Sequence, residues 1–103
     1  MSKRLAALEK MVAAVPSDPF VYYGLALEYR SAARLDDALG VFVTMRERFA
    51  SYVPQYLMAG QILKELGRKD HAREVLTLGI QAARAGRDSH AAGELESALA
   101  ELS

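Results

Sequence analysis

The sequence predicts an all-α protein, built as a solenoid of antiparallel helix hairpins with about six helices. Apolar residues recur at helical spacing along nearly the whole chain, and no stretch of strand length alternates between apolar and polar residues. Proline, glycine and aspartate interrupt this pattern at intervals typical of short helices. A chain of 103 residues, 51% of them hydrophobic, is long enough to bury one core.

The first two expected helices are separated by a proline-containing turn. The first covers about residues 2–15 and ends before Pro16, because the residue before a proline disfavours the helical region. Its apolar stripe consists of Leu5, Leu8, Val12 and Val15. Asp18 is the expected N-cap of the second helix, over residues 19–33, with Pro19 at its first position.

The middle of the chain predicts two more helices. Asp36 is the expected N-cap of a helix over residues 37–49. A break at residues 51–54 leads into a helix over about 54–66. Gly67 is expected to end this helix, since glycine adopts the left-handed conformation without steric cost.

The last two helices are expected over residues 71–85, with Asp70 as N-cap and Gly86 at the end, and over residues 89–102. The last helix has one apolar face and carries four acidic residues and no basic one. These acids are Asp88, Glu94, Glu96 and Glu101. A polar outer face is expected on the terminal helix of a repeat array, because it keeps the array in solution.

The four central helices repeat with a period of 34 residues. The matched pairs are Tyr22 and Tyr56, Ala26 and Gly60, Tyr29 and Leu63, Ala38 and Ala72, and Phe42 and Leu76. The expected turn residues Ala33 and Gly67 keep the same offset. A period held across two helices and their turn is a stronger signal than any single short motif.

This pattern resembles the tetratricopeptide repeat, in which aromatic residues and leucine alternate with small residues where two helices approach closely. The resemblance predicts a single tetratricopeptide-like domain over residues 1–103. It divides into an N-terminal half-repeat at 1–18, repeats at 19–52 and 53–86, and a C-terminal capping helix at 87–103. Members of this family bind a peptide or helix of a partner protein on a concave surface.

Two stripes on the first helices of the repeats are the candidate partner-binding residues of this concave groove. They are Phe20, Tyr23, Leu27 and Arg30 on one helix, and Leu57, Gln61 and Lys64 on the other. Their apolar members form a large set for an open surface, which indicates an interface. An amphipathic helix or apolar peptide suits them best, with Arg30 and Lys64 available to pair with an acidic group. The alternatives are a homo-oligomeric scaffold using the same surface, or cover by the C-terminal helix.

The sequence favours a non-catalytic, cytoplasmic protein that uses no cofactor and binds neither metal, nucleic acid nor membrane. The 13 basic residues balance the 13 acidic ones, cysteine is absent, and no long apolar run is present. His71 and His90 lie among polar residues, and no catalytic or phosphate-binding motif accompanies them.

One specialisation of the family is also excluded. Chaperone-binding relatives hold a C-terminal carboxylate with lysine and asparagine side chains on successive first helices. The corresponding positions here are Tyr23, Leu27, Met58, Asp88 and Ala92. None of these carries a cation, so no binding to chaperone C-terminal tails is expected.

Overall fold

A computed structural model describes residues 3–102, which form six α-helices and no strand. The helices are α1 (Lys3–Ala14), α2 (Pro19–Ser31), α3 (Leu35–Arg48), α4 (Pro54–Glu65), α5 (Lys69–Ala85) and α6 (Ser89–Ala100). This confirms the predicted all-α class and the expected number of helices. The chain divides into two compact units, residues 1–49 and 50–103.

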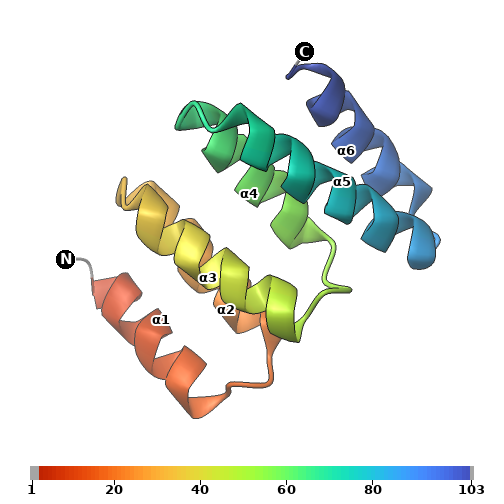
Figure 1. Cartoon of the computed structure of the whole chain (residues 1–103). Coiled ribbons are helices and arrows are strands. Elements are labelled where there is room, and N and C mark those ends of the chain that lie inside the picture. The colour runs from red at the N-terminus through yellow and green to blue at the C-terminus, as the bar shows by residue number, and fades with distance from the viewer. Residues whose placement is uncertain (1–2, 103) are drawn as a thin grey trace. The chain divides into compact units, whose positions relative to one another are not determined.

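The first unit is built around α2, which packs against both α1 and α3, and successive helices run antiparallel (Figure 1). Its buried apolar residues are Leu5, Tyr22, Leu25, Ala26, Tyr29, Ala38, Phe42 and Met45. Two tyrosine hydroxyls anchor the helices to one another. Tyr29 donates a hydrogen bond to the Glu9 carboxylate at 2.8 Å, and the Tyr22 hydroxyl accepts one from Arg48 at 2.6 Å.

In the second unit each of α4, α5 and α6 packs against the other two (Figure 1). Two glycines allow this close approach. A Cβ on Gly60 would lie 2.5 Å from Cδ2 of Leu76, and one on Gly79 would overlap Tyr56. The buried apolar residues are Tyr56, Ala59, Ile62, Leu63, Ala72, Val75, Leu76, Ile80, Ala83, Ala92, Leu95 and Leu102.

Two of the expected helix N-caps are wrong. Asp18 does cap α2, because its carboxylate accepts a hydrogen bond from the Phe20 amide at 2.9 Å. However, α3 begins at Leu35 and α5 at Lys69, and neither has a side-chain cap. Asp36 and Asp70 lie inside the first turns of these helices, where a carboxylate still interacts favourably with the positive helix end.

The reason for this shift is the backbone geometry of the turns before these helices. Ala33, Gly67 and Arg87 have positive φ angles of 60°, 77° and 56°. The amide after each bonds back to a carbonyl five residues earlier: Arg34 to Tyr29, Arg68 to Leu63, and Asp88 to Ala83. These are Schellman turns, which set the helix end through backbone hydrogen bonds. Gly67 has its expected role, whereas Gly86 has φ −87° and the left-handed residue after α5 is Arg87.

Candidate functional site

The first candidate surface is the α2 stripe, defined as Phe20, Tyr23, Leu27 and Arg30. The buried core residues of α2 lie outside this stripe, whose members are exposed or half-buried. Phe20 is 63% exposed, more than any other large apolar side chain that the structure describes. Tyr23, Leu27 and Arg30 are half-buried. The stripe therefore combines an exposed aromatic ring with partly supported neighbours.

Tyr23 is the best-supported member of the α2 stripe. Its ring centroid lies 6.3 Å from that of Phe42, which is fully buried on α3, and the two rings are tilted by 57°. Such tilted aromatic pairs are a favoured packing arrangement. Burial raises the pKa of the Tyr23 hydroxyl, and the charge of Arg30 opposes this shift. Tyr23 is therefore a fixed, neutral aromatic surface at physiological pH.

The second candidate surface is the α4 stripe, defined as Leu57, Gln61 and Lys64. Leu57 is half-buried, whereas Gln61 and Lys64 are exposed. Lys64 forms an ion pair with Glu101, at the end of α6, with Nζ 3.5 Å from the carboxylate. Although α6 packs beside α4, it leaves Gln61 exposed and Leu57 half-exposed. The C-terminal end of α6 therefore pairs with the Lys64 ammonium group but does not bury the α4 stripe.

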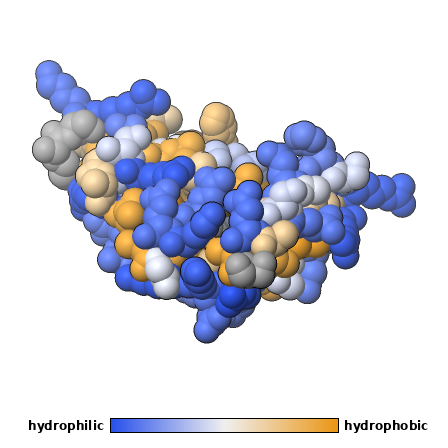
Figure 2. Space-filling model, turned by 90° about the horizontal axis from the view of Figure 1, so that it is seen from above, coloured by the Kyte–Doolittle hydropathy of each residue, from blue (hydrophilic) through white to orange (hydrophobic). Residues whose placement is uncertain are grey.

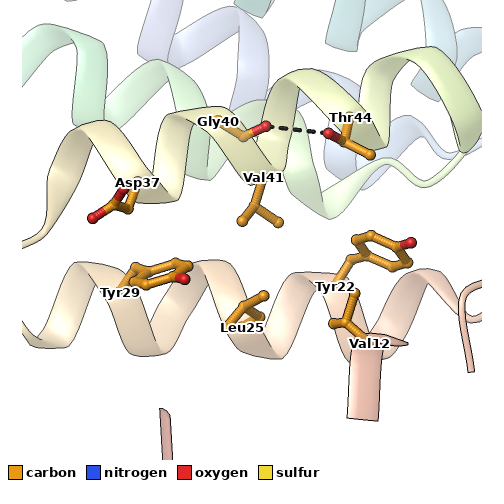
Figure 3. A pocket seen from close by; sticks show the side chains of 8 residues that line it. All are labelled: Val12, Tyr22, Leu25, Tyr29, Asp37, Gly40, Val41 and Thr44. Carbon is orange, nitrogen blue, oxygen red and sulfur yellow. Dashed lines mark hydrogen bonds between the residues drawn. The ribbon is translucent and has the colours of Figure 1, made fainter. Parts of the chain in front are cut away.

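A hollow in the first unit is a feature that the sequence did not indicate (Figure 3). It has a volume of about 300 Å³, and α2 forms its floor between α1 and α3. Its lining residues are Val12, Tyr22, Leu25, Tyr29, Asp37, Gly40, Val41 and Thr44. The repeat pattern identified the tyrosines as core residues and did not indicate free space above them. The absence of a side chain at Gly40 is the one signal that could have indicated it.

The remaining polar groups form surface pairs. Among the described residues, no group of histidine, cysteine, aspartate and glutamate side chains is arranged to hold a metal ion. His71 and His90 are both exposed, and His90 Nε2 lies 3.3 Å from the Glu94 carboxylate. Several of the basic residues are paired with acidic ones, as in Arg73 with Asp70. Figure 2 shows hydrophobic residues as patches separated by hydrophilic ones.

Solved structures similar to this chain include a solution structure of a tetratricopeptide repeat domain protein from Salinibacter ruber. It has 31% sequence identity and a TM-score of 0.81, over 84% of this chain and 88% of that one. The chain belongs to the tetratricopeptide repeat family. A crystal structure of a tetratricopeptide repeat domain protein from the same organism gives 30% identity and a TM-score of 0.78, over 82% and 96% of the two chains.

One further solved structure supports the fold alone, and two other comparisons find no match. A protein from Bordetella parapertussis, solved in solution, matches over 99% of this tetratricopeptide repeat chain and 89% of its own, with 24% identity and a TM-score of 0.81. No family model and no curated protein matches the sequence. The tetratricopeptide fold suggests a protein–protein interaction module. None of the helices within residues 3–102 has both the length and the apolar character needed to cross a membrane.

Proposed function

We propose that this tetratricopeptide repeat protein is a non-catalytic cytoplasmic module that binds a short peptide or helix of a partner protein. The α2 stripe is the principal contact. The observation that carries the proposal is the 63% exposure of Phe20, next to the half-buried Tyr23 and Leu27. Exposed aromatic rings with supported neighbours are typical of the central contacts of protein interfaces.

The chemistry of the two stripes defines the ligand. Apolar side chains of the ligand pack on Phe20, Tyr23 and Leu27, and an acidic side chain pairs with Arg30. The α4 stripe contributes Leu57 and Gln61 as further contacts. Lys64 contacts the ligand only if it gives up its ion pair with Glu101. That ion pair is exposed and therefore weak.

We further propose that the chain is one tetratricopeptide-like domain with the repeat division expected from its period. The half-repeat is residues 1–18, the repeats are 19–52 and 53–86, and the capping helix is 87–103. The helix bounds support this division, since α2 and α3 lie within one repeat and α4 and α5 within the next. The proposal assigns each stripe to the first helix of a repeat.

The test uses peptides selected against the 103-residue chain from a displayed random library. We expect a selected peptide to lose at least about tenfold in affinity for the Tyr23→Ala, Leu57→Ala double variant, measured by isothermal titration calorimetry. The matched control is Val43→Ala with Leu78→Ala, because these two side chains are each 41% exposed and lie outside both stripes. Equal affinity for both double variants contradicts the assignment of the site.

Self-association through the same stripes is the alternative that this experiment must separate. Light scattering over a dilution series measures it directly. A mass of 11.3 kDa at concentrations where the peptide binds excludes stripe-mediated self-association under those conditions. A larger mass that falls to the monomer value on Tyr23→Ala, Leu57→Ala substitution favours the scaffold instead.

A further inference from the structure

One face of α1 is uncovered although the same face of α3 is buried. Ala38, Phe42 and Met45 of α3 are fully buried, and Phe49 packs on the Tyr22 ring at 5.4 Å between centroids. The residues 34 positions earlier are Arg4, Leu8, Met11 and Val15. Met11 is 48% and Val15 45% exposed, so Val15 does not join the expected core stripe. In the part of the chain that the structure describes, Met11 and Val15 leave this face of α1 open, whereas Leu8 is half-buried beside Gly24 of α2.

Part of the complementary face of α6 is open, at Glu96 and Leu99, whereas Ala92 is buried. Its N-cap Asp88 lies 70 residues after Asp18, the N-cap of α2, and both carboxylates accept a backbone hydrogen bond. With this offset, the α2 residues Tyr22, Ala26 and Tyr29 correspond to Ala92, Glu96 and Leu99 of α6. Leu99 and Glu96 line a hollow of about 490 Å³ against α5. The full lining is Thr77, Ile80, Gln81, Arg84, Glu96, Leu99 and Ala100.

The two units differ in the helices that pack beside α2 in the first unit and beside α6 in the second. In the first unit, α2 has α1 on one side and α3 on the other, and the hollow above it has two walls. In the second unit, α5 forms one wall above α6, and no described helix takes the place that α3 has beside α2. A helix similar to α3 could therefore pack on this uncovered side of α6. The residues of α1 match those of α3 at an offset of 34 positions.

We propose that a second copy of this chain fills the vacancy: the α1 helix of one copy docks in the α5–α6 hollow of another. By the same offsets, the exposed Val15 takes the place of Phe49 and packs at Ala92, the counterpart of Tyr22, with Met11 next to it. The two half-repeats together form one whole repeat. Because two different surfaces meet, the contact is heterologous, and further copies add in the same way unless a ring closes.

Charge complementarity supports a second copy of this chain as the molecule that docks on α6. Two small residues, Ala26 on α2 and Ala38 on α3, are fully buried within the first repeat. In the intermolecular repeat these positions are Glu96 and Arg4, which carry opposite charges. Each now has an ion-pair partner in its own chain, at 3.4 Å from Arg4 to the half-buried Glu28 and 3.2 Å from the exposed Arg84 to Glu96. Exposed pairs contribute little and are easily exchanged.

The test is a charge swap between two separately purified proteins, Arg4→Glu and Glu96→Arg, followed by sedimentation equilibrium. For the wild type we expect a mass that rises above 11.3 kDa with concentration. Each variant alone brings like charges together and should associate at least about tenfold more weakly. An equimolar mixture restores an opposite-charge pair at every contact between unlike variants, so alternating copies should recover the wild-type behaviour.

Two controls keep the test decisive. Glu94→Arg changes a charge of α6 at an exposed position that does not line the hollow, and it should leave self-association unchanged. Met11→Gln removes an apolar contact without reversing a charge and should weaken it. A wild-type mass that stays at 11.3 kDa up to millimolar concentration, or a mixture that fails to recover, overturns the proposal. Neither outcome bears on the peptide site, whose residues lie on α2 and α4.

Discussion

Gly79 is one of the two glycines that allow the close packing of the second unit, so Gly79→Ala is a direct test of this packing. The added methyl group would overlap Tyr56 Cβ and lie 2.9 Å from its Cγ and 3.1 Å from Leu95 Cδ2. Tyr56 cannot swing aside easily, because its hydroxyl donates a 2.6 Å hydrogen bond to the Ala50 carbonyl. Helices α4, α5 and α6 must therefore separate to accept the methyl group.

The size of the effect follows from two opposing contributions. Overpacking a well-packed core costs about 1–3 kcal/mol. Replacing glycine by alanine inside a helix returns about 1 kcal/mol. We therefore expect Gly79→Ala to lower the free energy of unfolding by up to about 2 kcal/mol, and Tm to fall by about 4–8 °C for each kcal/mol.

The matched control is Gly40→Ala in α3, where a Cβ would meet no atom within 4 Å. Only the helix propensity changes there, so this variant should be more stable by about 0.5–1 kcal/mol. Chemical denaturation of both variants measures the difference. If Gly79→Ala stabilised the protein as much as Gly40→Ala does, the three helices could not cross as closely as described.

Two further predictions concern the backbone and pH. Ala33 has φ 60°, so Ala33→Gly should raise the free energy of unfolding by about 0.5–1 kcal/mol, whereas Ala32→Gly, at φ −84°, should not; denaturation with urea compares them. The hydrogen bond to Glu9, together with burial, raises the pKa of Tyr29. Its stabilising contribution is present below the unfolded pKa of about 10 and is lost as pH rises through the folded pKa, so Tyr29→Phe should lose less stability than the wild type between about pH 8 and 11. An equal loss in both proteins refutes the role of Tyr29.

The sequence predicted the features that depend on local spacing. Apolar residues at helical intervals and the 34-residue period give the helices, their number and the buried face of α2. The starts of α3 and α5 could not be predicted in this way, because backbone hydrogen bonds in the preceding turns set them. Arg87 also carries no sequence signal for a left-handed conformation, since that region normally favours glycine.

Contacts between side chains far apart in the sequence could not be predicted either. The pair of Lys64 with Glu101 joins residues 37 positions apart, and the bond of Tyr29 to Glu9 joins residues 20 apart. Neither pair belongs to the repeat pattern, so the period did not indicate them. The stripe residues themselves were identified from helical spacing, but the large difference in exposure between Phe20 and Tyr23 depends on the packing of Tyr23 against Phe42.

The most direct test of the proposed partner-binding site is the affinity of a library-selected peptide for Phe20→Ala, measured beside the wild type by isothermal titration calorimetry. Because Phe20 is 63% exposed, its removal should leave Tm nearly unchanged. We predict that the affinity falls about tenfold or more while Val43→Ala, at a 41% exposed position outside the stripes, binds like the wild type. An unchanged affinity for Phe20→Ala would contradict the assignment of the α2 stripe as the partner-binding surface.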